Sequence, residues 1–199
     1  MAVIPRSSSI VDLKTVLDLV STEQRGRLVE FLSGAVEALA RGGAEVGFLA
    51  SNTPHLVFDE IACRSPIPLV SIVESARDRA LALGLKRMGL FGTRFTMQAS
   101  FYAAAFAQVG IEVVVPQPQE QDYIHEKYLG ELVAGILLPE TRTGLLAIAQ
   151  LMKTRDGIEA LILGGTELPF ILRGDHDIGI PFLDTAQLHV QAVIAAAAS

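Results

Sequence analysis

The chain has 199 residues, of which 50% are hydrophobic and 19% are charged, and its formal net charge is −6. This composition excludes a disordered chain and disfavours a nucleic-acid-binding protein, which needs basic side chains to neutralise phosphates. No apolar run approaches the roughly 18 residues that cross a bilayer, a single cysteine leaves no internal disulfide, and residues 1–10 lack the features of a signal peptide. We therefore expect a globular cytoplasmic protein that binds neither membrane nor nucleic acid.

Short apolar runs alternate with helical patterns from one end of the chain to the other. Most of the runs are continuously apolar, which is typical of parallel strands that are covered on both faces. The pattern therefore predicts an α/β protein whose parallel sheets are flanked by helices. Strands are expected at residues 2–5, 45–50, 69–72, 88–91, 111–115, 160–163 and 181–183.

Helices are predicted between these strands. Ser21 and Gln24 form a capping-box pattern, which would open a helix that ends at Gly42-Gly43. Another helix is expected at about residues 141–155, where apolar residues recur at helical spacing. The last helix starts at about Ala186 and continues into an alanine-rich segment.

The sequence repeats itself weakly at a nearly constant offset. Residues 49–53 (Leu-Ala-Ser-Asn-Thr) match residues 163–167 (Leu-Gly-Gly-Thr-Glu), and residues 67–70 (Ile-Pro-Leu-Val) match residues 180–183 (Ile-Pro-Phe-Leu). Because two consecutive strand ends recur in the same order, the chain is expected to form two similar α/β lobes.

The repeat also sets the expected lobe boundaries. The N-terminal lobe would comprise residues 1–85 plus 186–199, the C-terminal lobe would comprise residues 86–185, and a ligand cleft would lie between them. The counterpart of the strand at residues 88–91 would fall before Met1. The N-terminal lobe is therefore expected to lack its first strand.

Three loops that follow predicted strands carry small or hydroxylic residues. They are residues 50–55, 92–97 and 164–167, and each directly precedes a helical pattern. In parallel sheets ligands bind beyond the carboxyl ends of the strands, where backbone N–H groups and the helix dipole favour an anion. The loops predict a site for a small carboxylate ligand, although ordinary helix capping would select similar residues.

The same loops resemble the motifs of the aspartate/glutamate racemase superfamily, in particular its broad-specificity amino-acid racemases. Residues 51–55 (Ser-Asn-Thr-Pro-His) resemble its Cys-Asn-Thr-x-His loop, and residues 163–167 resemble its Gly-Cys-Thr-Glu loop. Residues 90–102 and 184–189 resemble its Leu-Gly-Thr-x-x-Thr-Met…Phe-Tyr and Asp-Thr…His segments. The resemblance covers nearly the whole chain. It implies two pseudosymmetric lobes, an amino-acid ligand between them, and no metal or organic cofactor.

The resemblance also implies a mechanism with two thiols. One cysteine thiolate removes the α-proton of an acidic amino acid, and a thiol on the opposite face returns one. Here the two positions hold Ser51 and Gly165. A serine hydroxyl is no base at neutral pH without a partner, and glycine has no side chain. We therefore expect two-thiol racemisation to be impaired.

Other groups could in principle replace the thiols. His55 lies four residues after Ser51 and could activate its hydroxyl, and Glu167 could act as a carboxylate base if burial raised its pKa. The plainer interpretations are a histidine held by local hydrogen bonds and a glutamate that belongs to the family motif. Cys63 is expected to be a buried structural thiol.

Ligand-binding positions of the motifs are retained. By the resemblance, the residues that cradle the substrate carboxylates are Asn52, Thr53, Thr93, Thr96 and Thr166, with Arg94 as a candidate charge partner.

Three hypotheses about function follow from this sequence. They are an amino-acid racemase homologue, a non-catalytic carboxylate-binding or regulatory homologue, and a lyase or isomerase that uses Ser51 with His55 or Glu167. The apolar composition also favours a homodimer, since exposed apolar helical faces usually find partners.

Overall fold

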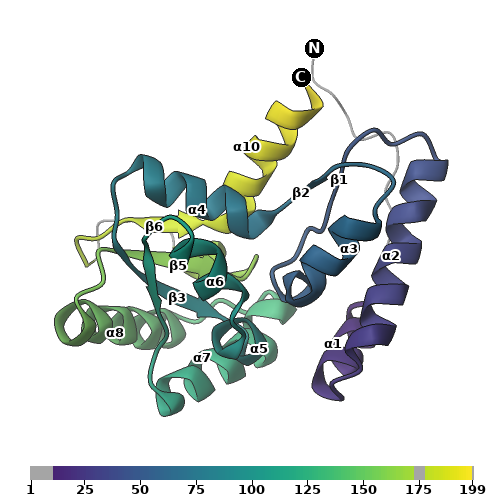
Figure 1. Cartoon of the computed structure of the whole chain (residues 1–199). Helices are drawn as coiled ribbons and strands as arrows, with labels where there is room; N and C mark the ends of the chain where they lie inside the picture. Colours follow the sequence, from purple (N-terminus) through teal and green to yellow (C-terminus); the bar gives the residue numbers. More distant parts are fainter. Residues whose placement is uncertain (1–10, 173–177, 199) are drawn as a thin grey trace.

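The structure, a computed structural model, describes residues 11–172 and 178–198. Two parallel sheets lie in two adjoining parts of the molecule (Figure 1). The smaller sheet pairs β1 (Gly47–Phe48) with β2 (Leu69–Val70). The larger sheet has the strand order β4-β3-β5-β6, and all of its pairings are parallel. Its strands are β3 (Arg87–Gly92), β4 (Glu112–Val114), β5 (Ala160–Gly164) and β6 (Phe182–Asp184).

The α/β class predicted from the sequence is confirmed by these parallel sheets and their flanking helices. The predicted strands at residues 45–50, 69–72, 88–91, 111–115, 160–163 and 181–183 overlap β1, β2, β3, β4, β5 and β6. The predicted strand at residues 2–5 lies outside the described residues.

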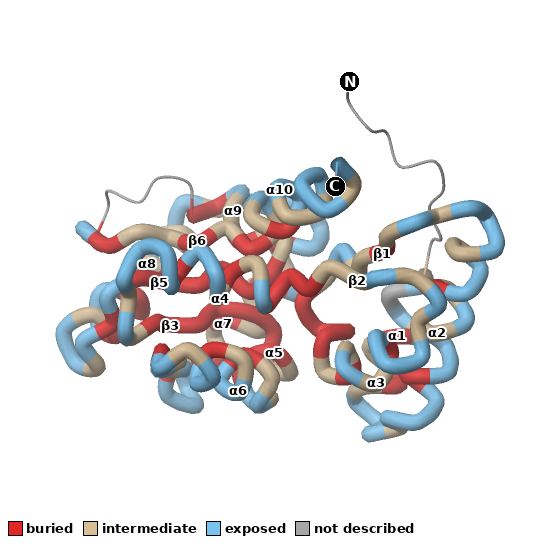
Figure 2. Tube along the Cα trace, turned by 45° about the horizontal axis from the view of Figure 1, so that its top comes forward, coloured by how far each residue is buried: buried red, intermediate tan, exposed pale blue. Residues whose placement is uncertain are grey.

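Helices cover both faces of the larger sheet. On β5, Leu161 and Leu163 face one core with α7 (Pro118–Gly130) and α8 (Pro139–Asp156), whereas Ala160 and Ile162 face the other. Such alternation is what a strand buried on both faces requires. The second core is closed by α4 (Ile72–Ala82) and α6 (Phe101–Ala107), and the buried segments run along β3 and β5 (Figure 2).

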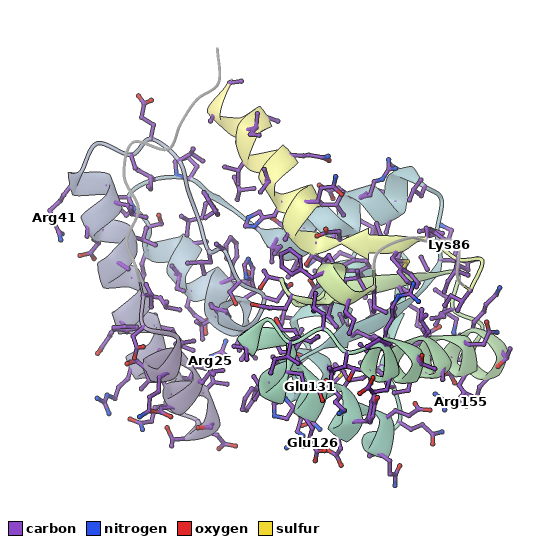
Figure 3. All side chains as sticks on the ribbon, turned by 180° about the vertical axis from the view of Figure 1, so that it is seen from behind. Arg25, Arg41, Lys86, Glu126, Glu131 and Arg155 are labelled. Atoms are coloured by element: carbon purple, nitrogen blue, oxygen red, sulfur yellow. The ribbon has the colours of Figure 1, made fainter. Side chains whose placement is uncertain are left out.

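Charged side chains join α7 to α8 at both ends of the helix pair. Glu131, just after α7, accepts hydrogen bonds from Lys127 and from the Thr141 hydroxyl of α8. Near the other end of α8, Arg155 Nη1 lies 2.8 Å from Glu120 Oε1 of α7. Glu131 and Arg155 are labelled in Figure 3 and mark the two ends of the helix pair.

The smaller half is built on helices that the sequence only partly predicts. Its core joins α1 (Leu13–Ser21), α2 (Arg25–Arg41), η1 (Thr53–Val57) and α3 (Phe58–Arg64). The predicted capping box at Ser21 is wrong. Ser21 is the last residue of α1 and its hydroxyl donates to the Asp18 carbonyl, so α2 begins after Gln24 without a side-chain cap.

Two helices that follow strand ends connect the halves. Helix α4 follows β2 but packs on the larger sheet, and α10 (Thr185–Ala197) follows β6 and packs on α4 and β2. Ser71 and Asp184 cap these helices in the same way, each accepting from the backbone N–H three residues later. The repeat thus includes the two helices. The lobe boundaries stay a prediction.

No helix in the described ranges is long and apolar enough to cross a membrane.

Candidate active site

Three threonines from two strand-end loops meet in the interior. Thr53 lies in η1, and Thr93 is the N-cap of α5 (Arg94–Gln98), where its hydroxyl accepts from the Thr96 backbone N–H at 3.2 Å. The Thr93 hydroxyl lies 3.3 Å from that of Thr53 and 3.1 Å from that of Thr96. All three side chains are buried. The structure therefore brings together three of the predicted ligand-binding residues, at a point where η1 contacts α5.

Asn52 holds this arrangement in place. Its side-chain oxygen accepts a 2.6 Å hydrogen bond from the Tyr102 hydroxyl, and its amide nitrogen donates to the Thr185 hydroxyl at 3.3 Å. Thr185 in turn donates to the Leu163 carbonyl at 2.7 Å. Tyr102 and Thr185 are buried, and burial raises the pKa of Tyr102. This chain of hydrogen bonds links the loop after β1 to the ends of β5 and β6.

The sequence places Tyr102 and Thr185 inside recognisable motifs but gives no signal of their shared partner. Their contacts with Asn52 join residues 50 and 133 positions apart, so only the folded chain shows them. Asn52 is thus a positioning residue of the loop that carries Ser51 and Thr53.

His55 is committed to the backbone on both sides of its ring. Its Nδ1 lies 2.9 Å from the Ser51 carbonyl oxygen, and its Nε2 accepts the backbone N–H of Ile72 at 3.2 Å. These contacts require the neutral ring with its proton on Nδ1. Burial lowers the pKa of His55 to about 3, which favours the same neutral form. In this arrangement neither ring nitrogen is free to accept a proton from the Ser51 hydroxyl.

A side chain at position 165 would collide with Tyr128 unless that residue moved. A Cβ placed there would lie 2.4 Å from Tyr128 Cε2 and 2.8 Å from the Tyr128 hydroxyl oxygen, distances that real Cβ atoms essentially never show. The Tyr128 hydroxyl donates to Glu167 Oε2, which also accepts a 2.7 Å hydrogen bond from the Thr166 hydroxyl. The structure therefore groups Thr166 and Glu167 with Tyr128, a residue that the sequence analysis did not select.

The side chains of Arg94 and Cys63 both reach the surface. The Arg94 guanidinium forms a 2.7 Å ion pair with Asp122 of α7, and about 40% of its side chain is exposed. The prediction that Cys63 is buried is wrong, because it lies on the exposed side of α3 near the end of that helix. Among the described residues, no group of three or more His, Cys, Asp or Glu side chains gathers closely enough to hold a metal ion.

A cavity of about 580 Å³ borders the same loop from another side. Its lining includes His55 of η1, the α4 N-cap Ser71, Arg77 of α4 and Phe101 of α6. The threonines at positions 53, 93 and 96 do not line it. The cavity is therefore distinct from the threonine cluster.

Comparison with known proteins identifies the family behind this geometry. A family model of Asp/Glu/hydantoin racemases matches residues 9–193. The chain belongs to the Asp/Glu/hydantoin racemase family. The superfamily membership predicted from the motifs is thereby confirmed.

Solved structures of this racemase family share the fold over most of the chain. A candidate Asp/Glu racemase from Yersinia pestis is 27% identical, with a TM-score of 0.86 over 95% of this chain and 82% of that one. An aspartate racemase homologue from Pyrococcus horikoshii OT3 is 34% identical, with a TM-score of 0.77 over 86% of this chain and 74% of that one.

A glutamate racemase from Francisella tularensis, solved in complex with D-glutamate, is 18% identical, with a TM-score of 0.67 over 86% of this chain and 64% of that one. At this identity the likeness to the glutamate racemase supports the fold alone.

Proposed function

We propose that this racemase-family chain binds a small amino acid or related carboxylate at the strand-end loops and does not perform two-thiol racemisation. The observation that carries the proposal is the state of the two thiol positions. His55 cannot serve Ser51 as a base, because both of its ring nitrogens are bound to the backbone. Gly165 has no side chain, and the Tyr128 ring occupies the space where one would lie.

The binding part of the proposal is supported by the threonine cluster. Hydroxyl groups can turn to donate hydrogen bonds to a carboxylate, and bonds to an ionised acceptor are stronger than those between neutral groups. The hydroxyls of Thr53, Thr93 and Thr96 now bond mainly to one another. The Thr93 hydroxyl can keep accepting from the Thr96 backbone N–H while its proton turns from a neighbouring threonine to a carboxylate oxygen.

Calorimetric titration with L- and D-aspartate and L- and D-glutamate tests the binding. Thr93→Val keeps the shape of the side chain and removes the hydroxyl, so we expect about tenfold weaker binding, the effect of losing one hydrogen bond to a charged group. Thr143→Val, on the exposed face of α8, is the matched control and should bind like the wild type. Equal affinity of the Thr93→Val and wild-type proteins, or no binding of any of the four ligands, would contradict the proposal.

We also propose that the protein is a homodimer and that it acts in the cytoplasm. Several large apolar side chains are exposed on the single chain, including Val190 and Ile194 of α10 and Phe170 of α9 (Leu168–Ile171). Such faces commonly pack against a partner. Light scattering behind size-exclusion chromatography should give twice the mass of one chain, and the mass of a monomer would contradict the dimer.

A further inference from the structure

Tyr128 occupies the position that a side chain of residue 165 would take. The tyrosine lies on α7, and only 6% of its surface is exposed. Its ring and hydroxyl both lie within 3 Å of the Cβ position at Gly165. Nothing in the sequence links the two residues, which are joined only because α7 packs on β5 through their shared core. Tyr128 thus fills the space that a side chain of residue 165 would occupy. We call the surface formed by Tyr128 and Glu167 beside Gly165 the Tyr128 wall.

The polar end of Tyr128 is oriented by the residues that follow Gly165. Its hydroxyl proton is directed at Glu167 Oε2, and the Thr166 hydroxyl donates to the same oxygen at 2.7 Å. Burial and the contact with Glu167 raise the pKa of Tyr128, so the phenol stays protonated. Its oxygen then has only lone pairs left to offer. Both hydrogen bonds end on Oε2 of Glu167, so neither uses the second carboxylate oxygen.

This wall adjoins the threonine cluster. Gly92 and Gly164 are paired neighbours at the ends of β3 and β5, and a Cβ at Gly164 would lie 3.3 Å from Thr96 Cγ2. The next residues along the two strands are Thr93 and Gly165. The hydroxyl donors of Thr93 and Thr96 therefore lie at the end of β3. The acceptor oxygens of Tyr128 and Glu167 lie beside the end of β5.

We propose that Tyr128 and Glu167 form the ammonium-binding wall of the site, with the Tyr128 ring in the place of a residue-165 side chain. An ammonium group has only hydrogens to donate, and this wall has only acceptors to offer. The threonine cluster takes the carboxylate of the same ligand. This inference rests on the proposed function, and it makes Tyr128 the residue that distinguishes an amino acid from a plain dicarboxylate.

The test compares L- and D-aspartate with succinate, which has the same two carboxylates and no amino group. Calorimetry on the wild-type protein should show at least tenfold tighter binding of one aspartate enantiomer. Tyr128→Phe leaves the ring against Gly165 and removes only the phenol oxygen. We expect it to weaken aspartate binding about tenfold and to leave succinate binding unchanged. Glu167→Gln should show the same selective loss.

Tyr123→Phe on the same helix is the matched control, because its hydroxyl lies against Gly144 of α8 rather than against the site. It should leave both affinities unchanged.

The outcomes separate this inference from the proposed function. If the wild type binds neither aspartate nor succinate, the proposed function itself fails. If the wild type binds aspartate but Tyr128→Phe retains full affinity, or loses affinity for aspartate and succinate alike, Tyr128 has only a packing role and the inference is overturned. Circular dichroism of each variant shows whether a loss of affinity reflects unfolding, and a Tyr128→Phe protein that unfolds also assigns Tyr128 to packing.

Discussion

Gly165→Ala is expected to lower the free energy of unfolding by about 1–3 kcal/mol, the usual cost of forcing an extra methyl group into a filled site. The added Cβ would lie 2.4 Å from the Tyr128 ring. Tyr128 cannot move away cheaply, because it is buried in the core of α7, α8 and β5 and its hydroxyl is bonded to Glu167. Urea unfolding monitored by circular dichroism measures the loss.

A double-mutant cycle attributes the loss to Tyr128. In a Tyr128→Leu background the ring is absent, so adding Gly165→Ala should cost much less than it does in the wild type. Gly34→Ala is the control, because no atom lies within 4 Å of its Cβ position in α2. That change should raise stability by roughly 0.5–1 kcal/mol through helix propensity. A Gly165→Ala protein as stable as the wild type would contradict the steric account of this position.

Acid is expected to destabilise the protein through His55. Burial lowers the pKa of His55 to about 3 in the folded state, against an ordinary value of 6.5. Between these two values the unfolded chain binds a proton that the folded chain does not, so stability rises with pH across this window. The contribution of neutral His55 to the free energy of unfolding is fully present above about pH 6.5. It is lost as the pH falls toward 3, at roughly 1.4 kcal/mol per pH unit.

The measurement is the free energy of unfolding at intervals between pH 7 and pH 4, for the wild type and His55→Gln. The variant lacks the titrating group, so its stability should fall less steeply with decreasing pH even if it starts lower. His189, whose pKa burial also lowers, acts in the same direction and remains in both proteins. Parallel slopes for the two proteins would show that His55 is not protected from protonation in the folded state.

Much of the fold could be predicted because the strands carry their own signal. β5 is buried at every residue, so its apolar run can only be an interior strand. Helix α1 was missed although Asp12 caps it through the Thr15 backbone N–H, because Ser21 and Gln24 suggested a later start. The exposure of Cys63 was missed because α3 is short and buries only one of its faces.

The candidate site could be predicted only where it follows the strand ends. Thr53 follows β1, and Thr93 and Thr96 follow β3, so the sequence places all three after strand ends. Their meeting depends on how the two sheets pack, because β1 and β3 belong to different sheets. Tyr128 had no such signal. It lies within α7, and its contact with Gly165 depends on how that helix packs on the sheet. Single-sequence patterns give the orientation of a helix face but not the identity of the atom that it meets.

Exchange of the α-proton in heavy water tests whether this chain can remove the α-proton of an amino acid. Purified protein is incubated with L- and D-aspartate and L- and D-glutamate, and the α-proton signal is followed by NMR beside a heat-denatured sample. Because His55 cannot act as a base for Ser51 and Gly165 has no side chain, we expect no exchange above the denatured control, even for a ligand that calorimetry shows to bind. Exchange well above that control would mean that another group removes the proton, and it would contradict a role limited to ligand binding.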